Sequence, residues 1–220
     1  MNKIAEITNS QYWNDYYFET TVPTLPSQFA VFVLSERLDS RIIIDIGCGN
    51  GRDTFFFREQ GYRCVGIDNS KSAIKSCKEK IAANNLTNIE FLNASINDKD
   101  LDKKISDALG LDDYSNILIY GRFFLHAIKD SEEERFFLVV SKILKNRTGS
   151  VALEFRTERD RFQMKSTPDH FRRYINPTRF FSKAEKRGFE VEYFVEGFGL
   201  AKYKTDDAHV ARFILLSRDY

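Results

Sequence analysis

The chain has 220 residues, 42% of them hydrophobic and 30% charged, which is enough to build one folded domain with its own core. Its formal net charge of +1 does not favour a nucleic-acid-binding protein, and no apolar run approaches the length of a membrane span. The three cysteines lack metal-ligand spacing and the start lacks a signal-peptide pattern, so we expect reduced thiols in a cytoplasmic protein. No acidic cluster is placed to bind magnesium, and no metal is expected.

Residues 1–41 are predicted to form a helical N-terminal extension, distinct from a domain at 42–220. The stretch from Tyr12 to Phe18 is densely aromatic, and a helix is predicted from Ser27 to about Leu38. Tyr12 and Tyr17 could close over a bound ligand as a lid, because aromatic faces attract a cation and a lid excludes water. Alternatively, this segment is an amphipathic helix packed against the edge of a sheet.

From residue 42 onward, strand patterns alternate with helical patterns. Strands are predicted at 42–46, 63–68, 89–93, 116–120 and 149–155, and helices at about 52–60, 70–84, 99–109 and 131–145. This alternation predicts a parallel sheet with helices on both faces. Ser131–Glu134 predicts a capping box, and Asn176-Pro177 starts a helix that ends near Gly188.

The pattern changes after residue 188. Phe189–Val195 and Val210–Ser217 are two further strand candidates, joined by a connection too short for a helical crossover. Two strands joined in this way should be antiparallel. A parallel sheet that ends in an antiparallel pair is not the usual arrangement of a dinucleotide-binding protein.

A glycine loop, Gly47-Cys48-Gly49-Asn50-Gly51, follows the strand at 42–46, and Asp68 ends the next strand 21 residues beyond Gly47. Glycines let the backbone approach a ligand closely, and an acid at this place accepts hydrogen bonds from ribose hydroxyls. Arg52 stands where the dinucleotide pattern has its last glycine, which favours S-adenosylmethionine over a dinucleotide. Alternatively, the glycines only make a tight turn and Asp68 caps a helix.

Asp45–Gly51 together with Gly66–Ser70 resembles the class I S-adenosylmethionine-dependent methyltransferases, over about residues 41–217. The resemblance implies an α/β, Rossmann-like, seven-stranded and mostly parallel sheet with helices on both faces and a C-terminal antiparallel strand. It also implies S-adenosylmethionine as the cofactor and S-adenosylhomocysteine as the product.

The same resemblance implies where the cofactor lies. Asp45 would approach its amino group, Gly47, Cys48 and Gly49 would meet its methionine moiety, and Asp68 would hold the ribose diol with Asn69 beside it. The adenine would contact the turn at Ser95 and Ile96, and the strand containing Tyr120 would form the floor beneath the sulfonium.

The methyl acceptor should bind beyond the carboxyl ends of the strands. His126 and Arg122 are the catalytic candidates. His126 is a candidate general base or else a histidine hydrogen-bonded within a turn, and Arg122 is a candidate partner of a negatively charged acceptor. The segment 156–175 holds six basic and three acidic residues, which suggests a small anionic acceptor. Arg156, His170 and Arg173 are its candidate ligands, together with Tyr12; alternatively, the segment is a surface loop with internal ion pairs.

Short pieces at 121–128 and 170–174 resemble methyltransferases of bacterial surface-polysaccharide biosynthesis. That resemblance implies O-methylation of a sugar or of a phosphate-type group on a glycan precursor. The alternatives are N-methylation of another small metabolite, methylation of nucleic acid, an NAD-linked oxidoreductase, and a module that binds the cofactor without turnover. The sequence does not indicate an oligomeric state.

Overall fold

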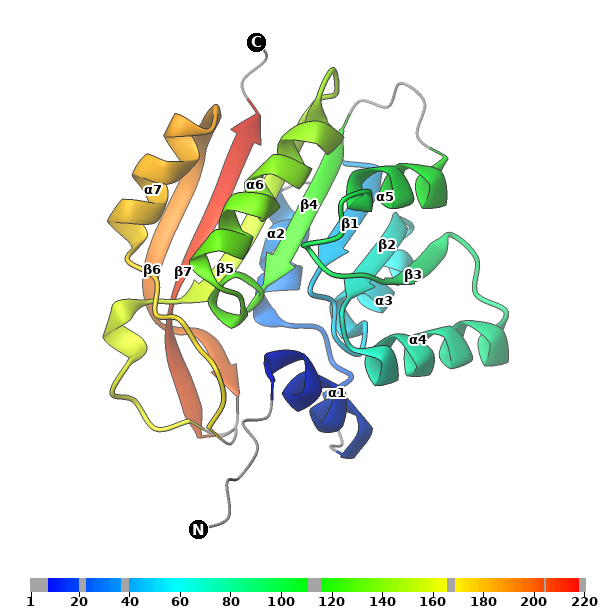
Figure 1. Ribbon diagram of the computed structural model, residues 1–220, viewed down its shortest axis with the longest axis horizontal. Coiled ribbons are helices and arrows are strands. Elements are labelled where there is room, and N and C mark those ends of the chain that lie inside the picture. Colours follow the sequence, from blue (N-terminus) through cyan, green and yellow to red (C-terminus); the bar gives the residue numbers. More distant parts are fainter. Residues whose placement is uncertain are drawn as a thin grey trace.

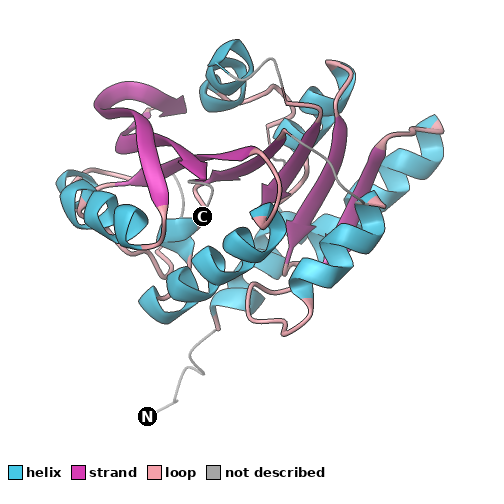
Figure 2. Cartoon of the chain, turned by 90° about the horizontal axis from the view of Figure 1, so that it is seen from above, coloured by secondary structure: helices cyan, strands magenta, loops and turns pink. Residues whose placement is uncertain are grey.

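The fold is a seven-stranded mixed sheet with helices on both faces (Figures 1 and 2). The structure, a computed structural model, describes residues 8–19, 23–36, 40–110, 116–165, 169–203 and 205–217. The strand order is β3-β2-β1-β4-β5-β7-β6. Across those ranges, no helix combines the length and apolar character that a membrane span requires.

The sheet contains a parallel part and an antiparallel end, as predicted. Its strands are β1 (Ile42–Ile46), β2 (Arg63–Asp68), β3 (Ile89–Asn93), β4 (Ile117–Arg122), β5 (Gly149–Arg156), β6 (Phe189–Tyr203) and β7 (Asp206–Ser217). Strands β1 to β5 pair in parallel, whereas β7 runs antiparallel to both β5 and β6. The predicted fold class is therefore confirmed.

Helices occur in each stretch where the sequence predicts one, and a further helix covers the aromatic N-terminal segment. They are α1 (Asn9–Glu19), α2 (Gln28–Glu36), α3 (Arg52–Glu59), α4 (Lys71–Asn84), α5 (Leu101–Leu109), α6 (Asp130–Leu144) and α7 (Pro177–Lys186), with short 3₁₀ turns η1 (Leu125–Ala127) and η2 (Glu158–Asp160). The predicted end of α2 at Leu38 lies outside the described residues.

Both faces of the sheet are covered, which explains why its central strands are almost continuously apolar. Ile42, Ile44 and Ile46 of β1 point into a cluster shared with α5, α6 and α7. Ile43 points to the opposite face, where it packs with α2 and α3. The sheet is thus rigid at the point where its strands end and the candidate site begins.

Two boundaries differ from the sequence prediction. Helix α6 starts at Asp130, and its capping box is formed by Lys129, whose backbone N–H donates to the Glu132 carboxylate at 2.7 Å. Ser131 is therefore inside the helix, and the predicted cap at that residue is wrong by two positions. Acidic side chains suit all of the first turn, so composition alone did not fix the starting residue.

The second difference is the length of the last two strands. The β6–β7 hairpin continues well past the predicted strand at 189–195, with a shift of register between Gly197 and Ala201. Figure 2 shows this extension curling away from the sheet. Gly197 and Gly199 interrupt the apolar alternation, which hid the extension from a pattern-based prediction.

Candidate active site

The glycine loop lies where β1 ends and is joined directly to the acid at the end of β2. Gly47 and Gly49 adopt φ angles of +78° and +54°, which L side chains rarely adopt. The Gly49 N–H donates to one carboxylate oxygen of Asp68 at 2.9 Å, and the Ser70 N–H donates to the other at 2.8 Å. Burial raises the pKa of Asp68, and these backbone hydrogen bonds oppose the rise. The loop and the acid therefore form one fixed unit.

Asp45 is a buried carboxyl on β1, close to this unit. Its only hydrogen bond from a described side chain comes from the Thr54 hydroxyl, at 2.6 Å, and it forms no ion pair with a described residue. Burial raises its pKa to about 8. Such a group is mostly neutral at pH 7, and a ligand that brings a cation would stabilise its ionised form.

Helix α1 lies across the carboxyl ends of the strands, over the glycine loop (Figure 1). The Tyr17 hydroxyl rests on Gly49 so closely that a Cβ added there would lie 2.1 Å from its oxygen. Tyr12 stacks on His170 of the loop after β5, with ring centroids 4.2 Å apart. One aromatic residue of α1 thus lies on the glycine loop and another lies on the histidine of the loop after β5.

A few polar contacts attach α1 to the start of α4. Asn14 accepts hydrogen bonds from the Ser72 N–H and hydroxyl at 3.1 and 2.6 Å. The Asn69 amide donates to the Ser10 hydroxyl at 3.1 Å. Asn69, a predicted cofactor residue, therefore connects α1 to the end of β2.

The turn after β3 lies beside Asp68, since the Ala94 N–H donates to the Asp68 backbone carbonyl at 3.1 Å. Within this turn, Ile96 is buried in the main apolar cluster, and the Ser95 hydroxyl accepts from the Asn97 N–H at 3.2 Å. The predicted adenine turn is therefore next to the predicted ribose acid.

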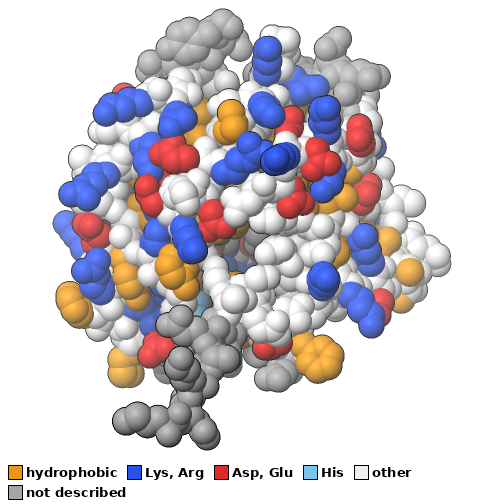
Figure 3. Space-filling view, in the orientation of Figure 1, with side chains coloured by type: hydrophobic (Ala, Val, Ile, Leu, Met, Phe, Trp, Pro, Cys, Tyr) orange, Lys and Arg blue, Asp and Glu red, His pale blue; other side chains and the backbone are white. Residues whose placement is uncertain are grey.

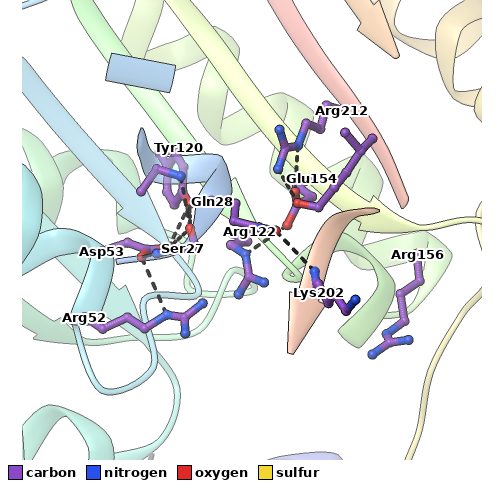
Figure 4. Close-up of polar contacts among 12 residues, drawn as sticks. Ser27, Gln28, Arg52, Asp53, Tyr120, Arg122, Glu154, Arg156, Lys202 and Arg212 are labelled. Atoms are coloured by element: carbon purple, nitrogen blue, oxygen red, sulfur yellow. Dashed lines mark hydrogen bonds and ion pairs between the residues drawn. The ribbon is translucent and has the colours of Figure 1, made fainter. Parts of the chain in front are cut away.

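Tyr120 points to the face of the sheet covered by α2 and α3. Its ring packs with Phe29, and its hydroxyl donates to Asp53 at 2.8 Å (Figure 4). Asp53 also accepts from the Ser27 N–H and hydroxyl, both at 2.7 Å, while Ser27 caps α2. Asp53 was not predicted, although an acid in the first turn after the glycine loop is a visible signal. It ties α2 to the loop.

His126 is buried in η1, and the Arg156 backbone N–H donates to its Nδ1 at 3.2 Å. Because that nitrogen accepts, the neutral ring carries its proton on Nε2. Burial, reinforced by the charge of Arg156, holds the pKa of His126 well below its usual range. This geometry does not favour the predicted general base, because the remaining nitrogen, Nε2, already carries the proton and has no lone pair to accept another.

Arg156 and Arg173, predicted to bind the acceptor, are held in ion pairs. The Arg156 guanidinium donates to Asp160 at 2.6 Å and to Asp206 at 2.7 Å, and all three side chains are buried. Arg173 donates to Asp130 and to Glu133 on α6. These contacts fix the shape of the loop after β5, and we therefore expect both arginines to support the acceptor site from outside.

A substitution of Arg156 distinguishes a structural ion pair from direct binding of the acceptor. Arg156→Met should lower the free energy of unfolding by about 3–5 kcal/mol, because it removes the buried guanidinium that bridges the carboxylates of Asp160 and Asp206. Urea denaturation followed by circular dichroism measures this change. A variant with wild-type stability and a raised KM for the acceptor would instead support direct binding.

Arg122 ends β4 and is arranged differently. Its Nε donates to Glu154 at 2.9 Å, and its guanidinium lies 4.2 Å from the centroid of the Phe123 ring. Figure 4 shows the guanidinium pointing away from Glu154 into the region flanked by Arg52 and Lys202. Of the predicted acceptor arginines, this one keeps donors available.

The arrangement of loop, buried acid and strand ends can now be compared with known proteins. A family model described as "Methyltransferase domain" matches residues 39–171. The chain belongs to this methyltransferase family. Membership confirms the class I S-adenosylmethionine-dependent methyltransferase predicted from the loop and Asp68, and with it the enzyme class and the cofactor.

Solved structures share the fold of this methyltransferase at low sequence identity. A SAM-dependent methyltransferase from Anabaena variabilis is 20% identical with a TM-score of 0.69, covering 95% of this chain and 93% of that one. The glycopeptide N-methyltransferase MtfA, solved with sinefungin, is 13% identical with a TM-score of 0.65 and coverages of 93% and 91%. The [4+2]-cyclase SpnF is 11% identical with a TM-score of 0.70 and coverages of 97% and 98%. Neighbours with such different reactions show the fold alone.

Proposed function

We propose that this methyltransferase transfers a methyl group from S-adenosylmethionine to a small anionic acceptor at the carboxyl edge of the sheet. The observation that carries the cofactor assignment is the pair of acids at this edge. Asp68 is fixed by the loop backbone, and Asp45 is a buried carboxyl without an ion-pair partner among the described residues. An ammonium group and a ribose diol are the groups that such acids bind.

The remaining predicted cofactor residues fit around this pair. We infer that the backbone of Gly47, Cys48 and Gly49 meets the methionine carboxylate and that Asn69 assists at the ribose. The turn at Ser95 and Ile96 would contact adenine, since it adjoins Asp68 through the Ala94 backbone. Tyr120 would act indirectly, because its hydroxyl bonds to Asp53 beside the loop.

When bound, S-adenosylmethionine supplies an electrophilic methyl group on a sulfonium. The protein's own contribution would be to hold the acceptor in line with that methyl and to exclude water. Residues 1–41 would act as a lid, because Tyr17 of α1 lies over the glycine loop and Tyr12 lies over His170. Aromatic faces at this place would also attract the sulfonium charge.

For the acceptor we propose a sugar or a phosphate-type group of a surface-polysaccharide precursor, methylated on oxygen in the cytoplasm. Arg122, which keeps donors available at the end of β4, and the resemblance at 121–128 and 170–174 support this proposal. Basic and acidic side chains are interspersed on the face shown in Figure 3, which does not favour nucleic acid. N-methylation is the second candidate, since MtfA is an N-methyltransferase with this fold.

Calorimetric titration with S-adenosylhomocysteine, with NAD in parallel, tests the cofactor assignment. We expect micromolar binding of S-adenosylhomocysteine and no heat from NAD. Turnover would then be screened with uronic and phosphorylated sugars against their neutral counterparts and against amines. Binding of NAD alone would overturn the proposal, and turnover only with neutral amines would overturn the acceptor class.

His126→Ala should lower kcat by roughly 10- to 100-fold with unchanged affinity for S-adenosylhomocysteine, because we infer that the Nε2–H orients the acceptor. The pKa of His126 lies well below its usual range, so the ring is neutral near pH 6.5. This group should therefore give no inflection of kcat/KM near that pH. Steady-state kinetics between pH 5.5 and pH 8, as a function of acceptor concentration, measures both effects. An inflection in that range that disappears in the variant would restore the role of a base.

A further inference from the structure

Arg122 is anchored through one of its three nitrogens and keeps the other two available. Its Nε bonds to Glu154, and the face of its guanidinium lies on the Phe123 ring. Its two Nη groups make no hydrogen bond with any described residue, although the side chain is only 17% exposed. Figure 4 shows this end of the side chain projecting into the region between Arg52 and Lys202. A fork held in this way is ready to bind two oxygens of one ligand group.

Glu154 holds the Arg122 guanidinium in place by accepting from its Nε. It lies on β5 in register with Arg122 on one side and with Arg212 on the other. Its second oxygen accepts from the Arg212 Nε at 2.8 Å, and its side chain is fully buried. Arg212 also donates to the Leu200 carbonyl, so its charge serves this internal bridge.

Arg122, Glu154 and Arg212 form a row of side chains whose charges do not balance. One carboxylate is shared by two guanidinium groups, which leaves about one positive charge, and the donors still available belong to Arg122. A partly buried positive charge without its own counter-ion is stabilised when an anion binds. The row therefore favours a ligand with one negatively charged group.

Phe123 supports the same interpretation independently. It is not a glycine, yet its φ is +58°, and such backbone strain is commonly found at functional sites. This conformation places the ring between the guanidinium groups of Arg122 and Arg156, at 4.2 and 5.3 Å. The ring also packs against Ala201, Ala208 and Val210, so the extended β6–β7 hairpin forms a wall beside the fork.

We propose that the two Nη groups of Arg122 bind a single oxyanion of the acceptor, a carboxylate or a phosphate, with Glu154 as the positioning residue. This subsite deepens the proposed function and rests on it for the identity of the molecule that carries the anion. Strand β4 is next to β1, whose end starts the glycine loop. An oxyanion held at Arg122 would therefore place the neighbouring part of the acceptor close to the cofactor.

Sodium acetate and inorganic phosphate, at constant ionic strength, are the probes for this subsite. Each is titrated into the ¹⁵N-labelled protein, with and without S-adenosylhomocysteine, while the backbone amide signals of Arg122, Phe123 and Glu154 are recorded. We expect a saturable shift with a millimolar midpoint, and the probe with the lower midpoint identifies the type of oxyanion. The midpoint should rise by roughly tenfold or more in Arg122→Gln. Glu154→Gln removes a negative charge, which by itself would lower the midpoint, so a midpoint that rises in this variant supports the positioning role of Glu154 and one that falls overturns it.

Arg159→Gln is the matched control, because Arg159 is a 71% exposed arginine of η2 and makes no contact with Arg122 or Glu154 among the contacts of the described residues. Its midpoint should equal that of the wild type. Arg122→Lys keeps the charge but cannot present two parallel donors while also bonding to Glu154, so its midpoint should rise as in Arg122→Gln. Thermal unfolding checks that each variant is folded.

The results separate this inference from the proposed function. Binding of S-adenosylhomocysteine without a saturable anion shift, or with the same midpoint in Arg122→Gln, would overturn the subsite alone. A saturable shift lost in Arg122→Gln, in a protein that does not bind S-adenosylhomocysteine, would support the subsite and overturn the cofactor assignment.

Discussion

Asp68→Ala should weaken binding of S-adenosylhomocysteine by roughly 100-fold or more. The estimate corresponds to the loss of two hydrogen bonds to a charged acceptor, at about 1.5–3 kcal/mol each. The proposed ribose diol supplies these bonds, and the carboxylate is already oriented by the N–H groups of Gly49 and Ser70. Isothermal titration calorimetry measures the affinity directly.

Two further variants show whether the loss is local. Asp107→Ala removes an exposed acid on α5 and should bind like the wild type. Asp68→Asn preserves the size of the side chain but removes its charge and one acceptor, so its affinity should lie between those of Asp68→Ala and the wild type. Wild-type affinity in Asp68→Ala would contradict the ribose assignment.

Cofactor binding at pH 7 should release close to one proton per site, and Asp45 is its expected source. Its pKa of about 8 means that the carboxyl is mostly protonated in the free protein. An ammonium group binds the ionised form, so the proton must leave when the cofactor binds. Affinity should accordingly rise by about tenfold per pH unit below pH 8 and level off above it.

Calorimetry in two buffers with different ionisation enthalpies counts the released protons. Asp45→Asn should abolish both the release and the pH dependence, with the Thr54 hydroxyl still able to donate to the new amide oxygen. Proton release that persists in this variant would assign it to another group and would contradict the position proposed for the ammonium.

Much of the fold was predictable because its signals are local. The alternation of strand and helix patterns, the glycine loop and Asp68 all lie within short stretches, and each has a direct physical meaning. The antiparallel end followed from the short connection between its two strands. The length of the β6–β7 hairpin did not, because its glycines break the alternation that marks a strand.

The side chains around the proposed acceptor site were less predictable because their partners are distant in sequence. The sequence around a basic residue does not show whether that residue binds a ligand or pairs with a carboxylate of the same chain. One partner of Arg156, Asp206, is fifty positions away in the sequence, and Arg122 bonds to Glu154 on the neighbouring strand. The role of Asp53 could not be identified from the sequence, because its partners Ser27 and Tyr120 come close to it only in the folded chain.

The position of Tyr17 has a kinetic consequence. Its hydroxyl fills the space directly above Gly49, where a cofactor would have to lie against the loop. Helix α1 is attached to α4 by a small number of polar contacts, so we expect it to swing away and return on its own timescale. The observed association rate of the cofactor should then stop rising at high concentration, at a plateau equal to the opening rate of α1. The same opening would limit the rate at which S-adenosylhomocysteine dissociates. One helix would then control both cofactor binding and product release in every catalytic cycle.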